Sequence, residues 1–158
     1  MNNQDFYNSL PKKRMSAGAL FFDEQGKLLI VNPTYKPPWE IPGGIIEENE
    51  SPREGCIREI KEELGLDWQP ERLLCIDYDH PGTIRSEAVS FIFYGGVLRE
   101  DEIDNIQLQQ SELSEYRFVT IAEAGELVNG RLTQRLRQIM PIINSKQTLY
   151  LEDQESID

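Results

Sequence analysis

The chain has 158 residues, which suits one folded domain with a hydrophobic core of its own. Its formal net charge of −12 argues against non-specific binding to nucleic acid through a basic surface. Cys56 and Cys75 lack metal or redox spacing and read as buried free thiols, and no segment approaches the ~18 apolar residues of a membrane span, so a soluble, cytoplasmic protein without membrane contact is expected.

The first part of the chain predicts a β-hairpin followed by a loop. Apolar runs at residues 14–22 and 27–31 flank the turn sequence Asp23-Glu24-Gln25-Gly26. Three prolines make residues 32–39 a loop, and the short segment 39–46 that follows is expected to be extended.

Strands and helices then alternate in the second half of the chain. Three apolar segments predict strands: residues 73–78, 88–98 and 116–119. The capping box Thr120-Ile121-Ala122-Glu123 opens a helix toward Val128, and residues 132–142 repeat apolar side chains at helical spacing. Residues 148–151 resemble one more strand.

Between these halves, residues 51–65 predict a helix with clear ends. Ser51-Pro52-Arg53-Glu54 is a capping box with proline at the first helical position, and Gly65 supplies the left-handed residue that often ends a helix. At about 100° per residue, one arc forms the core face. This arc contains Ile57, Ile60 and Leu64, with Cys56 at its edge.

The same helix carries three carboxylates on one face. Glu59, Glu62 and Glu63 are spaced i, i+3, i+4, where like charges repel each other. Mg²⁺ takes oxygen ligands and shares itself with substrate phosphates, so this triangle favours a divalent cation held against a phosphate. Upstream, Pro42-Gly43-Gly44 provides a backbone that can pass close to a ligand.

The whole segment resembles the signature of the Nudix (MutT-like) hydrolase family, G-x5-E-x7-R-E-U-x-E-E-x-G-U, where U is bulky and apolar. All of its fixed positions are matched: Gly44, Glu50, Arg58, Glu59, Ile60, Glu62, Glu63, Gly65 and Leu66. Element order alone suggests a mixed sheet with helices on both sides, as one of several α/β options. The resemblance implies a single Nudix-type α/β/α sandwich over residues 1–158, with a loop–helix–loop catalytic motif and flexible ends at 1–13 and 152–158.

The resemblance also implies a chemistry. Glu59, Glu62 and Glu63, with the carbonyl of Gly43, would hold Mg²⁺ or Mn²⁺, and Glu62 and Glu63 would take part in catalysis. The reaction would be hydrolysis of the diphosphate bond in a small-molecule nucleoside diphosphate linked to another moiety: a nucleotide sugar, an ADP-ribose-like compound or a nucleoside triphosphate. A bound metal neutralises the diphosphate and lowers the pKa of water.

Three further residues receive roles from the resemblance. Arg58 would orient a ligand carboxylate through a bidentate hydrogen bond; the alternative is a solvated surface arginine. Glu112 is the first choice for the general base and Glu115 the second, against the alternative of two solvated loop acids. Glu50 is expected to support the loop–helix junction.

Substrate contacts are less specific in the sequence. Tyr35 and Trp39 could stack on a base and Arg85 could meet a phosphate, although packing or surface roles are the ordinary alternative for each. His80 is either a proton donor or a loop residue. No nucleic acid partner is expected, and a homodimer is one option for assembly.

Two other classes share this fold. A catalytically silent nucleotide-binding or regulatory module would usually lack the carboxylates of the Nudix signature, whereas Glu59, Glu62 and Glu63 are all present here. An isoprenoid diphosphate isomerase needs a catalytic cysteine in a surrounding that neither Cys56 nor Cys75 supplies.

Overall fold

The computed structural model of the protein describes residues 1–157. The strands are β1 Arg14–Phe22, β2 Leu28–Pro33, β3 Gly43–Ile45, β4 Arg72–Asp79, β5 Ala88–Val97, β6 Leu113–Val119, β7 Leu149–Glu152 and β8 Glu155–Ser156. The helices are α1 Asn3–Ser9, α2 Pro52–Leu64, α3 Glu100–Asp104, α4 Ile121–Leu127 and α5 Gly130–Ile139, with a 3₁₀ turn η1 at Met140–Ile142. Every element expected from the sequence is present, whereas α1, α3 and β8 were not predicted.

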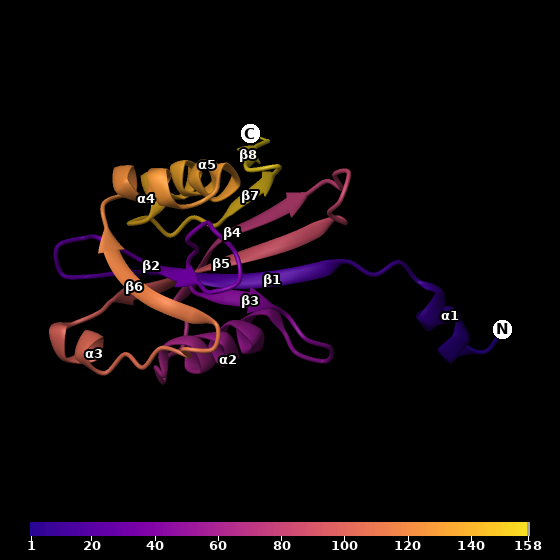
Figure 1. Cartoon of the computed structure of the whole chain (residues 1–158). Coiled ribbons are helices and arrows are strands. Elements are labelled where there is room, and N and C mark those ends of the chain that lie inside the picture. Colours follow the sequence, from indigo (N-terminus) through magenta and orange to yellow (C-terminus); the bar gives the residue numbers. More distant parts are fainter. Residues whose placement is uncertain (158) are drawn as a thin grey trace.

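The strands form one mixed sheet in the order β6-β2-β1-β5-β4-β7-β8, and β3 pairs with β1 at its side. β1 runs parallel to β5 and β4 runs parallel to β7. Helix α2 covers one face of the sheet, and α4 and α5 cover the other (Figure 1). The predicted α/β/α sandwich with a mixed sheet is therefore confirmed.

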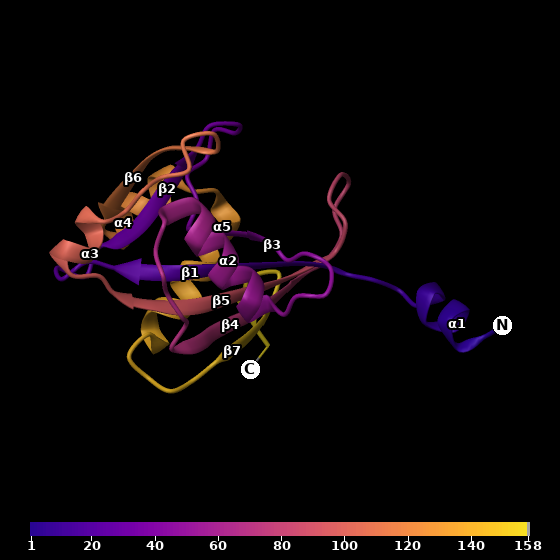
Figure 2. The same ribbon diagram turned by 90° about the horizontal axis from the view of Figure 1, so that it is seen from below.

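Alternation along β1 separates two cores, because successive side chains of a strand point to opposite faces. Ala17, Ala19 and Phe21 pack on the side of α2, and Leu20 and Phe22 pack on the side of α4 and α5. Figure 2 shows α2 lying over β1 on the first of these faces.

Helix α2 has the ends that its sequence predicts. Ser51 Oγ accepts a hydrogen bond from the Glu54 backbone N–H at 3.0 Å, and the Glu54 carboxylate accepts one from the Ser51 N–H. Gly65 ends the helix in the left-handed region with φ +71°. One detail of the core face was wrong: Cys56 is fully buried and Ile57 only half-buried. The buried arc is therefore turned slightly toward Cys56.

The predicted hairpin of β1 and β2 pairs only at its closed end, at Phe22 and Leu28. Farther along, the chain of residues 39–45 enters between the two strands. Val31 exchanges backbone hydrogen bonds with Glu40, and the Ala19 N–H donates to the Pro42 carbonyl. This insertion brings β3 beside β1 on the side facing α2.

The two ends of the chain differ. Helix α1 stands away from the sheet in both views (Figures 1 and 2), and all of its residues are exposed. At the other end β7 pairs with β4 and turns back into β8. Residues 152–158 were expected to be a flexible end, but residues 152–156 form this hairpin, since Gln154 hydrogen bonds to a buried carboxylate of β4. Across residues 1–157, no helix combines the length and apolar character needed to cross a membrane.

The buried carboxylate of β4 that Gln154 contacts belongs to Asp77, whose side chain is completely buried. Asp77 Oδ2 accepts a hydrogen bond from Arg135 Nε at 2.8 Å, which ties α5 to the sheet. The Gln154 backbone N–H donates to Asp77 Oδ1 at 3.1 Å. The pair is therefore both charged and hydrogen-bonded, as a buried ion pair has to be.

Replacing Asp77 by alanine should lower the free energy of unfolding by about 3–5 kcal/mol, because the buried Arg135 guanidinium would lose its hydrogen-bonded carboxylate and keep only Asp79 at 3.7 Å. Urea denaturation measures this change. The matched control is Asp67→Ala, which breaks the exposed pair of Asp67 with Lys61 and should cost less than about 1 kcal/mol. Equal losses in the two variants would show that the Asp77 pair does not hold α5.

Candidate active site

The backbone of β3 lies directly against the acidic side of α2. The Gly43 N–H donates a hydrogen bond to Glu63 Oε2 at 3.2 Å. A Cβ on Gly44 would lie 2.5 Å from the carboxyl carbon of Glu59, and one on Gly43 would lie 2.2 Å from the Ala17 carbonyl oxygen. A side chain at Gly43, whose φ is +148°, would collide with the backbone of β1, and a side chain at Gly44 would displace the Glu59 carboxylate.

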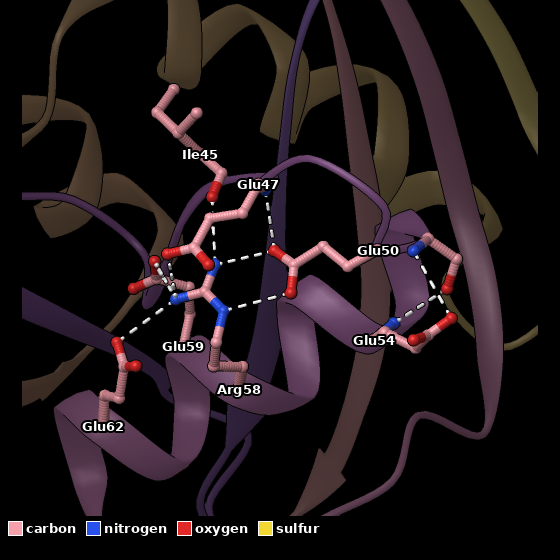
Figure 3. A network of polar contacts seen from close by, with 8 residues as sticks. Ile45, Glu47, Glu50, Glu54, Arg58, Glu59 and Glu62 are labelled. Atoms are coloured by element: carbon pink, nitrogen blue, oxygen red, sulfur yellow. Dashed lines mark hydrogen bonds and ion pairs between the residues drawn. The ribbon is translucent and has the colours of Figure 1, made fainter.

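Arg58 is the centre of the polar contacts on this side of α2 (Figure 3). Its Nε and Nη2 donate to the two carboxylate oxygens of Glu50 at 3.1 and 2.8 Å. Nη1 donates to Glu59 Oε1 at 3.0 Å and to Glu62 Oε2 at 3.2 Å. The expected bidentate bond is present, but its partner is Glu50, and the candidate ligands Glu59 and Glu62 receive one hydrogen bond each.

Glu50 connects the loop before α2 to the helix. Besides binding Arg58, its Oε1 accepts a hydrogen bond from the Glu47 backbone N–H at 2.8 Å. The hydrogen bonds from Arg58 hold the pKa of Glu50 below its ordinary value. A Cβ on Gly55 would lie 2.8 Å from Glu50 Oε1, so that helix glycine makes room for this carboxylate. The arrangement agrees with the expected supporting role of Glu50.

Two of the three helix carboxylates are disfavoured as anions. Glu63 is 7% exposed, and burial, with nearby acids adding to it, raises its pKa to about 8. Burial also raises the pKa of Glu59, although hydrogen bonding to Arg58 opposes the shift. Glu62 is the open member of the triangle, with a side chain 47% exposed. A cation beside these carboxylates would favour their charged forms.

The donor chemistry fits Mg²⁺ or Mn²⁺, since every candidate ligand supplies oxygen. Within residues 1–157, however, no three His, Cys, Asp or Glu side chains are arranged as a ready metal cluster. The hydrogen bonds explain this, because Arg58 donates to Glu59 and Glu62, and Glu63 accepts from the Gly43 N–H. Glu59, Glu62 and Glu63 thus have the oxygen ligands that Mg²⁺ or Mn²⁺ prefers, and each of these carboxylates accepts a hydrogen bond from within the protein.

The structure separates the two candidates for the base. Glu112 immediately precedes β6, and its charge contributes to the raised pKa of both Glu59 and Glu63, where burial is the larger cause. Glu115 lies within β6 and pairs with Arg117. The pKa of Glu63 also responds to Glu40, which lines the adjoining cavity. Sequence reasoning missed Glu40, because nothing in its local pattern distinguishes it from other loop acids.

A cavity of about 250 Å³ opens beside Gly43 and Gly44, and it receives two of the three predicted substrate contacts. Tyr35 and Arg85 line it. Trp39 does not: it is 8% exposed and packs in the core on the α5 side of the sheet, with the Arg117 guanidinium 4.7 Å from its ring centroid. The expectation that Trp39 stacks on a substrate base was therefore wrong, because its ring is covered.

His80 lies outside this cavity. Its Nδ1 is 2.7 Å from Asp153 Oδ2, and both residues line a second cavity near the β4–β5 loop. The two cysteines are buried, as expected, and burial raises the pKa of each thiol to about 12. Neither thiol is suited to nucleophilic chemistry.

Known proteins share both the sequence pattern and the fold. The NUDIX domain model matches residues 12–141. An RNA pyrophosphohydrolase from Hydrogenovibrio crunogenus is 29% identical over 113 residues, which are 62% of this chain and 67% of that protein. The human 8-oxo-dGDP phosphatase NUDT18 is 33% identical over 99 residues, 58% of this chain and 29% of that protein, so the match spans less than a third of its length.

A solved structure agrees with the architecture. The crystal structure of a MutT protein from Methanosarcina mazei is similar with a TM-score of 0.70 at 23% identity, covering 87% of this chain and 100% of that one. Its sheet and helices therefore have the same arrangement. With the family's domain matched over residues 12–141, the chain belongs to the Nudix family.

Proposed function

We propose that the protein is a metal-dependent hydrolase that cleaves the diphosphate bond of a nucleoside diphosphate linked to another moiety. One observation carries this proposal: the glycine backbone of β3 contacts the carboxylates of α2 and also lines a cavity. The names of the relatives, a pyrophosphohydrolase and a nucleotide phosphatase, support the bond type. The proposed substrate is a small nucleotide. The protein would act in the cytoplasm, and a homodimer is one option for its assembly.

The residues divide the work as follows. Glu59, Glu62 and Glu63, with the Gly43 carbonyl, would hold Mg²⁺ or Mn²⁺. When bound, such an ion neutralises the diphosphate and acidifies water. Arg58 positions Glu59 and Glu62 through its two single hydrogen bonds.

The remaining groups act on water and substrate. Glu112 would accept the proton of the attacking water, a role supported by the effect of its charge on the pKa of both Glu59 and Glu63. Tyr35 and Arg85 contact the substrate from the cavity wall. Glu40 lines the same wall together with Lys36, with which it forms an ion pair.

Chelation should abolish hydrolysis, and added Mg²⁺ should restore it. In melting experiments, several mM Mg²⁺ or Mn²⁺ should stabilise the wild type, by about 2.7 kcal/mol at 100 times Kd. Glu62→Gln should lose most of this gain, because it removes the most accessible ligand. Glu126→Gln, an exposed acid of α4, removes the same charge away from the site and should keep the full shift. An equal metal shift in wild type and Glu62→Gln would reject the metal site.

Glu112→Gln should lower kcat by about 10²–10⁴-fold, the usual contribution of a general base. Glu115→Gln is the matched control, since its side chain pairs with Arg117, and kcat should change little. Steady-state kinetics at saturating Mg²⁺ compares the two. The reverse ranking would transfer the role to Glu115, and two small effects would exclude both acids.

Gly44→Ala should lower activity by about 10–100-fold, because the new Cβ displaces the Glu59 carboxylate, and disturbed ligand support typically costs this much. The melting temperature without metal should change little, since the clash is with the end of a flexible side chain. Gly125→Ala places a Cβ at an ordinary 3.6 Å from Thr133 and serves as control. Full activity in Gly44→Ala would show that contact between β3 and Glu59 is not needed.

A further inference from the structure

The cavity beside Gly43 and Gly44 continues into a second one of about 500 Å³. The two cavities share four lining residues: Arg14, Asp79, Arg85 and Arg131. Together they lead from the glycine backbone, past the start of α5, to the loop between β4 and β5. A substrate whose diphosphate lies at the carboxylates of α2 would therefore have beside it a hollow with a volume larger than that of a diphosphate group.

Three different elements bring the arginines to this hollow. Arg14 begins β1, where it is in register with Ala88 at the start of β5. Arg85 lies in the loop just before β5, and Arg131 lies in the first turn of α5. The convergence therefore depends on the tertiary fold and is absent from any local sequence pattern.

The charged neighbours of these arginines are already engaged elsewhere. Asp79 is 3.7 Å from Arg135 and accepts a hydrogen bond from Gln154. Asp153 accepts a hydrogen bond from the His80 backbone N–H, and Glu40 pairs with Lys36. By contrast, Arg14 donates only to Ser86, and within residues 1–157 neither Arg85 nor Arg131 forms an ion pair. In a chain with 28 acids and 16 bases, three guanidinium groups around one hollow are left without a carboxylate partner.

We propose that Arg14, Arg85 and Arg131 form an anion subsite, which binds a phosphate group of the substrate outside the diphosphate that is cleaved. Guanidinium groups match phosphate oxygens with bidentate hydrogen bonds, and arginine is the preferred residue for this recognition. This inference rests on the proposed function, because that function places the scissile bond beside the subsite. It narrows the substrate class to nucleotides with further phosphate, ahead of nucleotide sugars and ADP-ribose.

The first test measures binding without turnover. Inorganic tripolyphosphate is titrated by calorimetry into the full chain in excess chelator, so that the box carboxylates repel it and only the arginines attract it. We expect Arg131→Gln and Arg14→Gln each to weaken Kd by about 10-fold or more, the value of one charged hydrogen-bonded contact. Arg137→Gln changes an exposed arginine of the same helix that lines neither cavity, and it should bind as the wild type does.

The second test asks which substrate phosphate uses the subsite. kcat/KM is measured for a nucleoside triphosphate, for a dinucleoside tetraphosphate and for ADP-ribose. Arg131→Gln should lose about 10-fold more toward a phosphate-rich substrate than toward ADP-ribose. A selective loss toward the triphosphate assigns the subsite to the end of a phosphate chain, and a selective loss toward the tetraphosphate assigns it to a phosphorylated leaving group.

The two tests fail separately. If no substrate is hydrolysed, the proposed function fails, and tripolyphosphate binding still decides the subsite. No tripolyphosphate binding by the wild type, or equal binding by wild type, Arg131→Gln and Arg14→Gln, overturns the subsite. Equal losses of kcat/KM toward all three substrates overturn it as well, because a subsite for further phosphate has to discriminate between them.

Discussion

The close contact between the backbone of residues 43–45 and the acidic side of α2 is the constraint on which the site depends. There is no room between them for a Cβ at Gly44, and the Gly43 N–H is bonded to Glu63. To reach this position the chain has to enter between β1 and β2, which is why their hairpin pairs only at its closed end. The inserted segment also lines the cavity on the other side of β3, so it contributes to both the fold and the site.

A single arginine contacts most of the carboxylates that this packing concentrates. Arg58 hydrogen bonds to Glu50, Glu59 and Glu62, and without it those carboxylates would face each other across a poorly solvated surface. Within residues 1–157 Glu63 forms no ion pair, and burial raises its pKa to about 8. A metal ion at this site would therefore share Glu59 and Glu62 with Arg58. Its charge would stabilise the anionic form of Glu63 most, because the pKa of that carboxyl is raised to about 8.

Local patterns predicted what local physics determines. The capping box and Gly65 placed the ends of α2, and periodicity placed the strands, because both depend on neighbours within a few residues. Long-range packing decided the rest. The covering of Trp39 by Arg117 and the contact of Gln154 with Asp77 join segments far apart in the chain, and no spacing reveals them. The resemblance to the Nudix signature named the α2 carboxylates, but it could not show that Arg58 holds two of them.

Charge in this protein is arranged by location, and the total of −12 conceals that arrangement. Exposed charges farther apart than about 8–10 Å are largely screened at physiological salt, so a bound anion responds to its nearest groups. On one side of β3 those groups are the carboxylates of α2, which repel an anion unless a metal lies between them. On the other side they include Arg14, Arg85 and Arg131, while the acids Glu40 and Asp79 are paired with Lys36 and Arg135. An acidic chain can thus attract a phosphate-rich nucleotide, provided that the metal and the arginines act on different phosphates of the same molecule.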